Sequence, residues 1–169
     1  SKKLCLIDVQ TGSVTELFTL EVISDLVASG LSYNPVNGKL YGLGVPEFCG
    51  LTRFFSVDPI TGETQLLAED NESICGIWLV IDNDGVAYMA DVISDALFTV
   101  NLVSGTVTQV GPLGIDLNFA QDADVNPATN DIIIAAFNGD GFGYHSVNKT
   151  TGQATFLYNN GSEQLTMVS

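Results

Sequence analysis

One short segment occurs four times along the chain, and it constrains the fold more than any other feature. In each copy, Ile or Val is followed by Asp or Asn, and Thr-Gly or Ser-Gly ends the segment. The four copies are residues 7–12, 57–62, 100–105 and 147–152. Their glycines are separated by 43 to 50 residues. A period of this length is typical of solenoids, propellers and repeat arrays.

Each copy has the composition of a turn between two β-strands. An apolar run ends in Asp or Asn, whose side chain can accept a hydrogen bond from the backbone two residues further on. The glycine then allows a positive φ. An alternating segment follows each turn, at residues 13–17, 63–67, 106–110 and 153–157. The pattern therefore predicts a β-hairpin in every repeat.

A second hairpin pattern lies between these copies and occurs three times, at residues 31–41, 79–88 and 123–133. Its turn contains Gly38 in the first copy and Gly85 in the second, whereas the third has Asn130 at that place. Asn is the non-glycine residue that best tolerates a left-handed backbone. The substitution therefore supports the alignment of the three copies.

The two hairpins together predict four strands in each repeat of about 45 residues, in an all-β chain. The chain starts at the third strand of one repeat, and residues 164–169 resemble a first strand. We expect a single domain over residues 1–169, with repeats at about 1–29, 30–75, 76–120 and 121–163, followed by the partial strand 164–169. A β-propeller-like array of four blades or part-blades is the favoured fold. A β-sandwich is the alternative, although sandwich strands rarely repeat one pattern four times.

The turn segment at 58–62, Asp-Pro-Ile-Thr-Gly, resembles the Asp-Pro-x-Thr-Gly-x-x-Thr repeats of secreted or surface-anchored bacterial β-propellers. The resemblance covers nearly the whole chain, and the WD and kelch signatures are absent. It implies a propeller fold and an extracytoplasmic location. It implies no activity, because propellers carry many unrelated functions.

The strand count leaves the ring unclosed, which would expose strand edges. Three explanations are open. The chain is part of a longer propeller, or it pairs with a copy of itself as a homodimer that completes a ring, or it forms a compact four-bladed ring. We favour the first two, so the expected partners are a second copy or the remainder of a longer chain.

Charge and hydropathy exclude several functions. Five Lys and Arg against twenty Asp and Glu give a net charge of −15. Such a chain repels nucleic acid and anionic membrane surfaces, whereas cationic ligands and calcium remain open. The longest strongly apolar run, residues 74–81, is far below the roughly 20 residues of a membrane-spanning helix. We therefore expect no membrane insertion, and no segment has the pattern of a signal peptide.

The irregular loops between repeats are the expected functional face, because variable loops on a rigid scaffold usually carry binding. These loops are residues 45–53, 69–75, 91–96, 111–122 and 138–145. Cys49 and Cys75 fall in neighbouring loops on this face, so a disulfide between them is as expected as three free thiols. Cys5 is the odd cysteine, and no cysteine spacing is typical of zinc.

Asp122 and Asp124 fall in the first strand of the last repeat, where the preceding repeat has Trp78 and Val80. We expect this innermost strand to line a central channel, where charged side chains need water, a metal or a cationic ligand. The polar residues predicted to join them are Asp116, Gln121 and Asp140. Together they could form an acidic channel mouth that binds calcium through oxygen ligands, with a hydrated, unliganded channel as the alternative.

Catalytic motifs are absent. His145 has no acid or nucleophile at motif spacing, and no Gly-x-Ser-x-Gly elbow occurs. The candidate ligand-binding residues are Asp116, Gln121, Asp122, Asp124, Asp140 and His145. The sequence favours a non-catalytic extracytoplasmic binding or scaffold module for a protein or carbohydrate ligand, with calcium as the one cofactor considered. The alternative is a metal-assisted hydrolase or lyase whose metal is held by Asp122 and Asp124.

Overall fold

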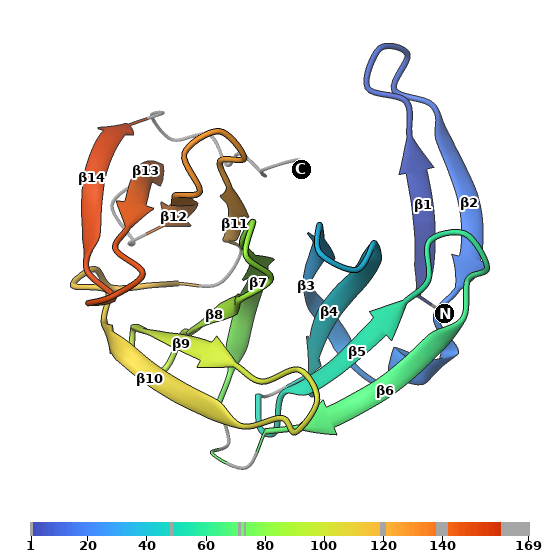
Figure 1. The fold of residues 1–169 in the computed structure, drawn as a ribbon, viewed down its shortest axis with the longest axis horizontal. Helices are drawn as coiled ribbons and strands as arrows, with labels where there is room; N and C mark the ends of the chain where they lie inside the picture. Colours follow the sequence, from blue (N-terminus) through green and yellow to red (C-terminus); the bar gives the residue numbers. More distant parts are fainter. Residues whose placement is uncertain are drawn as a thin grey trace.

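The computed structural model describes residues 2–47, 49–70, 72, 74–118, 121–137 and 142–159. Within these residues the chain forms antiparallel β-sheets connected by turns and loops (Figure 1). One 3₁₀ turn at Glu21–Ile23 is the only helical segment there. No helix in the described part of the chain is long and apolar enough to cross a membrane.

Four sheets follow one another along the chain, and each keeps its strands in sequence order. Sheet 1 pairs β1 (Lys3–Ile7) with β2 (Val14–Thr19). Sheet 2 contains β3 (Val27–Asn34), β4 (Lys39–Val45), β5 (Arg53–Val57) and β6 (Thr64–Glu69). Sheet 3 contains β7 (Gly76–Ile81), β8 (Ala87–Asp91), β9 (Ala96–Val100) and β10 (Val107–Pro112). Sheet 4 contains β11 (Asp122–Val125), β12 (Ile132–Phe137), β13 (Phe142–Val147) and β14 (Ala154–Asn159).

The repeated segment forms the turn before the last strand of every sheet, and its residues explain why. In sheet 2, the Asp58 carboxylate accepts hydrogen bonds from the backbone N–H groups of Ile60, at 2.8 Å, and Thr61, at 3.0 Å. Gly62 follows with a φ of 75°, which a side chain would disfavour. Asp8, Asn101 and Asn148 accept equivalent bonds in the other three sheets.

The sheets stack face to face around a common centre, with the first strands of sheets 2, 3 and 4 innermost (Figure 1). Strand β7 lies against β3 on one side and against β11 on the other. A sandwich would instead pack two sheets against each other. The sandwich alternative is therefore wrong, and the predicted array of four-stranded sheets is confirmed.

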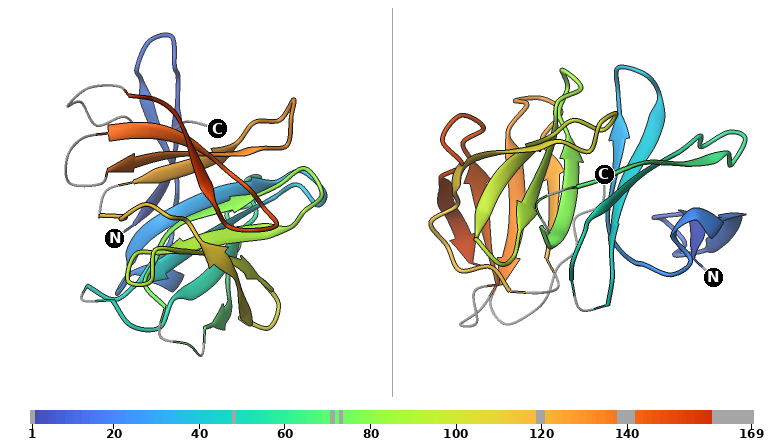
Figure 2. Two further views of the ribbon diagram at one scale, coloured as in Figure 1. Left: turned by 90° about the vertical axis from the view of Figure 1, so that its left-hand side faces the viewer. Right: turned by 90° about the horizontal axis from the view of Figure 1, so that it is seen from below.

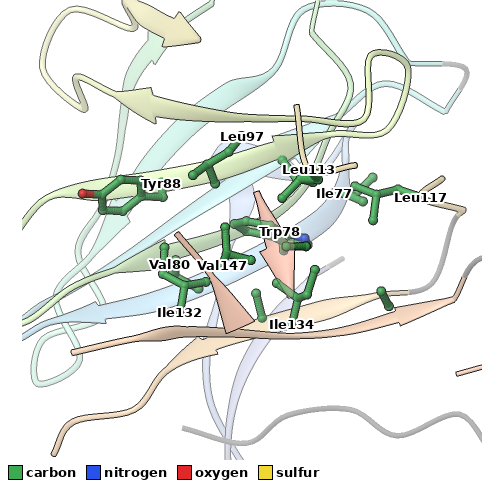
Figure 3. Packing of buried hydrophobic residues seen from close by; sticks show 14 residues of the cluster. Ile77, Trp78, Val80, Tyr88, Leu97, Leu113, Leu117, Ile132, Ile134 and Val147 are labelled. Carbon is green, nitrogen blue, oxygen red and sulfur yellow. The ribbon is translucent and has the colours of Figure 1, made fainter. Parts of the chain in front are cut away.

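Apolar side chains fill the space between successive sheets. The largest cluster lies between sheets 3 and 4, where Trp78 is fully buried among Val80, Ile132 and Ile134 (Figure 3). A second cluster joins sheets 2 and 3, and a third joins sheets 1 and 2. Strand residues alternate between the two faces of a sheet, so each sheet contributes one set of side chains to each neighbour.

Polar contacts also join sheets 3 and 4 at their turns. Lys149, in the turn before β14, forms an ion pair of 2.7 Å with the carboxylate of Asp82, in the turn after β7. The Asp82 side chain is only 2% exposed. The backbone N–H of Asn83 donates a hydrogen bond of 2.9 Å to the side-chain oxygen of Asn130. These contacts link the turns of the two sheets.

Candidate functional site at the loop end

The stacked sheets have two different ends. The turns within the hairpins β3–β4, β7–β8 and β11–β12 lie together at one end (Figure 2, right). We call the opposite end, formed in the described chain by residues 46–47, 49–52, 70, 72, 74–75, 92–95, 113–118 and 121, the loop end. These connections are irregular in sequence, whereas the turns repeat. The loop end is therefore the candidate for ligand recognition.

Asp70 ties two loops of sheet 2 together. Its carboxylate accepts hydrogen bonds from the backbone N–H groups of Thr52, Glu72 and Ile74. The Thr52 hydroxyl donates to the carbonyl of Ile74, at 2.5 Å, and accepts from the N–H of Gly76. Asp70 and Thr52 are both buried. A buried carboxylate with several N–H donors holds its loop in one conformation.

Asp91 and Asp95 make the same kind of link in sheet 3. Asp91 is buried, and it accepts hydrogen bonds from the N–H of Cys75 at 3.0 Å and from the hydroxyl of Ser94 at 2.6 Å. Asp95 has a positive φ of 51° and accepts a bond of 2.7 Å from the N–H of Leu117. The carboxylate of Asp91 therefore joins the β8–β9 connection to the loop before β7, and the carboxylate of Asp95 joins the same connection to the loop after β10.

A disulfide between Cys49 and Cys75 adds a covalent link to this network. It joins the loop after β4 to the loop before β7, the two loops in which the sequence places these residues. Cys75 is buried, and its N–H and carbonyl are bonded to Asp91 and Val92. Cys5 is the free cysteine.

The predicted carboxylates Asp122 and Asp124 lie on one face of β11. Ala123, between them, belongs to the cluster shared with sheet 3. Because strand residues alternate, the two carboxylates lie on the opposite face, directed away from sheet 3. Both carboxylates therefore lie on the face of sheet 4 that does not pack against sheet 3. Partial burial raises the pKa of Asp124, against one hydrogen bond from the N–H of Val125 that lowers it.

The remaining predicted residues do not gather around that pair. Asp116 is exposed in the loop before β11. Gln121 is half-buried, and its amide nitrogen donates to the carbonyls of Asn118 and Phe137. Asp140 lies outside the described residues. The predicted acidic mouth is thus represented in the described chain by Asp122 and Asp124 alone.

His145 lies on the other face of sheet 4. It is opposite Ile134 in the register of β12 and β13, and it is buried. Its ring meets Phe156 edge to face, with 5.5 Å between ring centroids. Burial lowers the pKa of His145, so the imidazole is neutral at physiological pH. Within the described residues its Nδ1 atom has no hydrogen-bond partner, and the sheet separates it from Asp122 and Asp124.

In the part of the chain that the structure describes, no three His, Cys, Asp or Glu side chains are grouped so that they could hold a metal ion. Asp82 and Asp91 lie at opposite ends of the β7–β8 hairpin, and both carboxylates accept hydrogen bonds from backbone N–H groups. Calcium therefore stays an expectation from composition.

Sequence reasoning missed the part that Asp70, Thr52 and Asp91 play in connecting the loops of the loop end. A usable signal was present for one of them: Asp91 ends an apolar strand and has Ser94 three residues later, which is the pattern of a side-chain-stabilised turn. No comparable signal marks Asp70 as the partner of Thr52, because those residues meet only in the folded chain.

No family model and no curated protein matches the chain. Solved structures match it over nearly its whole length. A chain in the crystal structure of the nidogen/laminin complex superposes with a TM-score of 0.68 and 12% identity, over 94% of this chain and 59% of that one. TolB from Acinetobacter baumannii superposes with a TM-score of 0.61 and 13% identity, over 95% of this chain and 38% of that one. Regucalcin from Agrobacterium tumefaciens, a calcium-binding protein, superposes with a TM-score of 0.61 and 17% identity, over 91% of this chain and 53% of that one.

TolB and regucalcin are β-propeller-type proteins. The fold is that of a β-propeller. Sheets 2, 3 and 4 are four-stranded blades, and sheet 1 contributes the third and fourth strands of another. Identities of 12–17% show the fold alone. The chain spans between 38% and 59% of the length of these three solved structures.

Proposed function

We propose that this propeller segment is a non-catalytic extracytoplasmic binding module whose ligand surface is the loop end. The observation that carries the proposal is the network of Asp70, Asp91 and the Cys49–Cys75 disulfide, which joins loops of two blades. Loops that are held before a ligand arrives lose less conformational entropy on binding. Such a network keeps the loops of a binding surface in one conformation.

The exposed side chains of the loop end favour a protein ligand. Apart from Ser94, the exposed side chains described there are apolar or acidic: Glu47, Leu51, Glu72, Ile93 and Asp116. Ile93 is 69% exposed. A surface that presents apolar and acidic side chains is complementary to a protein surface that carries apolar and basic residues. A carbohydrate is the alternative ligand class, and the experiment below separates the two.

The disulfide supports the extracytoplasmic location. Disulfides form and persist in secreted, periplasmic and surface proteins, and they are rare in the reducing cytosol. The only histidine of the sequence, His145, is buried against Phe156 on a blade face and is not at the loop end.

Binding arrays of extracellular proteins and of oligosaccharides would test the proposal with the oxidised chain. We expect a protein ligand whose affinity falls about tenfold in Ile93→Ser. A Cys49→Ser and Cys75→Ser double variant should also bind more weakly, because its loops are less constrained. Val103→Ser is the matched control, since Val103 is 88% exposed but lies in a turn at the other end.

Equal weakening by Ile93→Ser and Val103→Ser would contradict a loop-end site. A hydrolase or lyase activity on a polysaccharide that is lost in Asp122→Asn would overturn the non-catalytic role and support the metal-assisted enzyme. Binding to oligosaccharides alone would reassign the ligand class while leaving the loop-end surface in place.

A further inference from the structure

We propose that an ordered water molecule is bound in the protein interior between Trp78 of sheet 3 and Gln121, the residue before the first strand of sheet 4. This water accepts a hydrogen bond from the indole N–H and donates one to the glutamine side-chain oxygen. The site lies beneath the loop end and does not depend on a ligand there, so this proposal and the proposed function can fail separately.

The donor is the indole N–H of Trp78, which is the only tryptophan of the sequence. Trp78 is fully buried, and within the described residues its Nε1 atom has no hydrogen-bond partner. Figure 3 shows this nitrogen on the side of the ring nearer Leu117 and Ile134 and away from Val80. An indole N–H can only donate, and buried donors in folded proteins are nearly always paired, either with the protein or with ordered water.

The acceptor is the side-chain oxygen Oε1 of Gln121. The amide nitrogen of this residue donates to the carbonyls of Asn118 and Phe137, the second bond being 3.1 Å long. Because a carbonyl can only accept, these two bonds fix which atom of the amide is the nitrogen. The oxygen on the other side is buried and has no partner in the described chain. It therefore needs a donor.

The donor and the acceptor lie in the same part of the interior. The two carbonyls that bind the glutamine amide belong to Asn118, which directly follows Leu117, and to Phe137, which directly follows Ala136. Leu117 and Ala136 are members of the buried cluster that contains the tryptophan. Strands β7 and β11, which carry or adjoin the two residues, also lie side by side.

The chemistry of the two atoms selects water as the ligand. The bound species must accept a bond on one side and donate a bond on the other, so a metal cation and a fully ionised anion are both unsuitable. It must also be small, because the tryptophan has no exposed surface. A water molecule meets both requirements, and buried waters in proteins make about three hydrogen bonds to polar groups of this kind.

Such a water would link sheets 3 and 4 at the place where a side chain links sheets 2 and 3. There, the Ser29 hydroxyl of β3 donates a bond of 2.9 Å to the carbonyl of Gly76 in β7. In the alignment that places Leu79 at the position of Leu31, Ile77 occupies the position of Ser29. Isoleucine has no hydroxyl group, so the polar link to the following sheet comes instead from the next residue, through its indole N–H and the water.

NMR spectroscopy of the full, oxidised chain tests the proposal directly, because one tryptophan gives one indole N–H resonance. Magnetisation transfer from water should reach this proton in both NOE and ROE experiments, with opposite signs. Opposite signs indicate contact with a long-lived bound water, whereas proton exchange gives the same sign in both. Gln121→Met has a side chain of similar length without the acceptor, and the signal should be lost in it. Gln109→Met, at an exposed position of β10, is the matched control and should keep the signal.

No transfer from water to the indole N–H of the parent chain would overturn the proposal, because the interface would then be dry. This measurement needs no variant, so a failure of Gln121→Met to fold does not protect the proposal. Undiminished transfer in a folded Gln121→Met chain would also contradict it, since the water would not then depend on the glutamine oxygen. A dry indole N–H whose chemical shift changes in Gln121→Met alone would show a direct bond between the two side chains and would likewise exclude the water.

Discussion

The backbone of Gly105 lies so close to that of Glu69 that a β-carbon at Gly105 would overlap the Glu69 carbonyl oxygen. Gly105 belongs to the repeated turn of blade 3, and Glu69 ends the outermost strand of blade 2. The same relationship joins Gly152 to Gly111 in the next pair of blades. Gly12 has a similar φ of 72° but nothing within 4 Å of a β-carbon. The repeated glycine therefore makes a turn in every blade and a close contact only where a preceding blade is present.

This contrast predicts two different costs for one substitution. Gly12→Ala should destabilise the chain by about 1 kcal/mol, the cost of a left-handed backbone at a residue with a side chain. Gly105→Ala should cost about 2 to 4 kcal/mol, since the overlap with Glu69 adds to the same backbone cost. Urea denaturation of both variants measures the difference. Equal costs would mean that the blades can separate slightly without losing stability.

Lys149 and Asp82 predict a measurable coupling between blades 3 and 4. Lys149→Met leaves a carboxylate that is 2% exposed without its cation, and should cost about 2 kcal/mol. Asp82→Asn in the Lys149→Met background should recover part of that loss, because an amide oxygen can still accept the bonds from Asp84 and Val86. Unfolding free energies of the four chains in a double-mutant cycle give the coupling. Strict additivity would show that the ion pair contributes nothing beyond the turn bonds.

His145 predicts a loss of stability on mild acidification. Its folded-state pKa lies below the ordinary value of 6.5, chiefly because of burial. Below that pH the unfolded chain takes up a proton that the folded chain resists, so stability falls as the pH falls, by at most about 1.4 kcal/mol per pH unit. Melting temperatures of the parent chain and of His145→Gln between pH 7.5 and 5.5 test this. As the pH falls, the melting temperature of the parent chain should fall relative to that of His145→Gln. Parallel curves of melting temperature against pH would contradict the prediction.

Asp124 predicts the opposite dependence. Burial raises its pKa above 3.8, so the folded chain holds this proton more tightly than the unfolded chain does. The stability that the group contributes is complete below pH 3.8 and is lost as the pH rises through the raised pKa. Asp124→Asn should therefore stabilise the chain at pH 7, by about 0.5 kcal/mol, and not at pH 3.5. Denaturation at both pH values, with the exposed Asp116→Asn as control, provides the measurement.

The repeat predicted the strands and the turns because these depend on local chemistry. Asp58 and Gly62 make the same turn wherever they occur, since the carboxylate and the positive φ act within five residues. The candidate site was less accessible to this reasoning. The sequence places Asp122 and Asp124 on an innermost strand expected to line a channel, but the face of the sheet on which their side chains lie depends on how the sheets pack.

By itself, the sequence determined the repeat, the four-strand unit, the turn chemistry and the acidic character of this protein, because each depends on residues that are close together in the chain or on a sum over it. Only the tertiary structure decided which side chains are covered. Leu31 and Leu79 occupy the same place in the repeat and have the same side chain, yet one is half-exposed and the other buried. The meeting of Asp70 with Thr52 and the separation of His145 from Asp122 have the same origin: they depend on how sheets and loops pack, which no local pattern records.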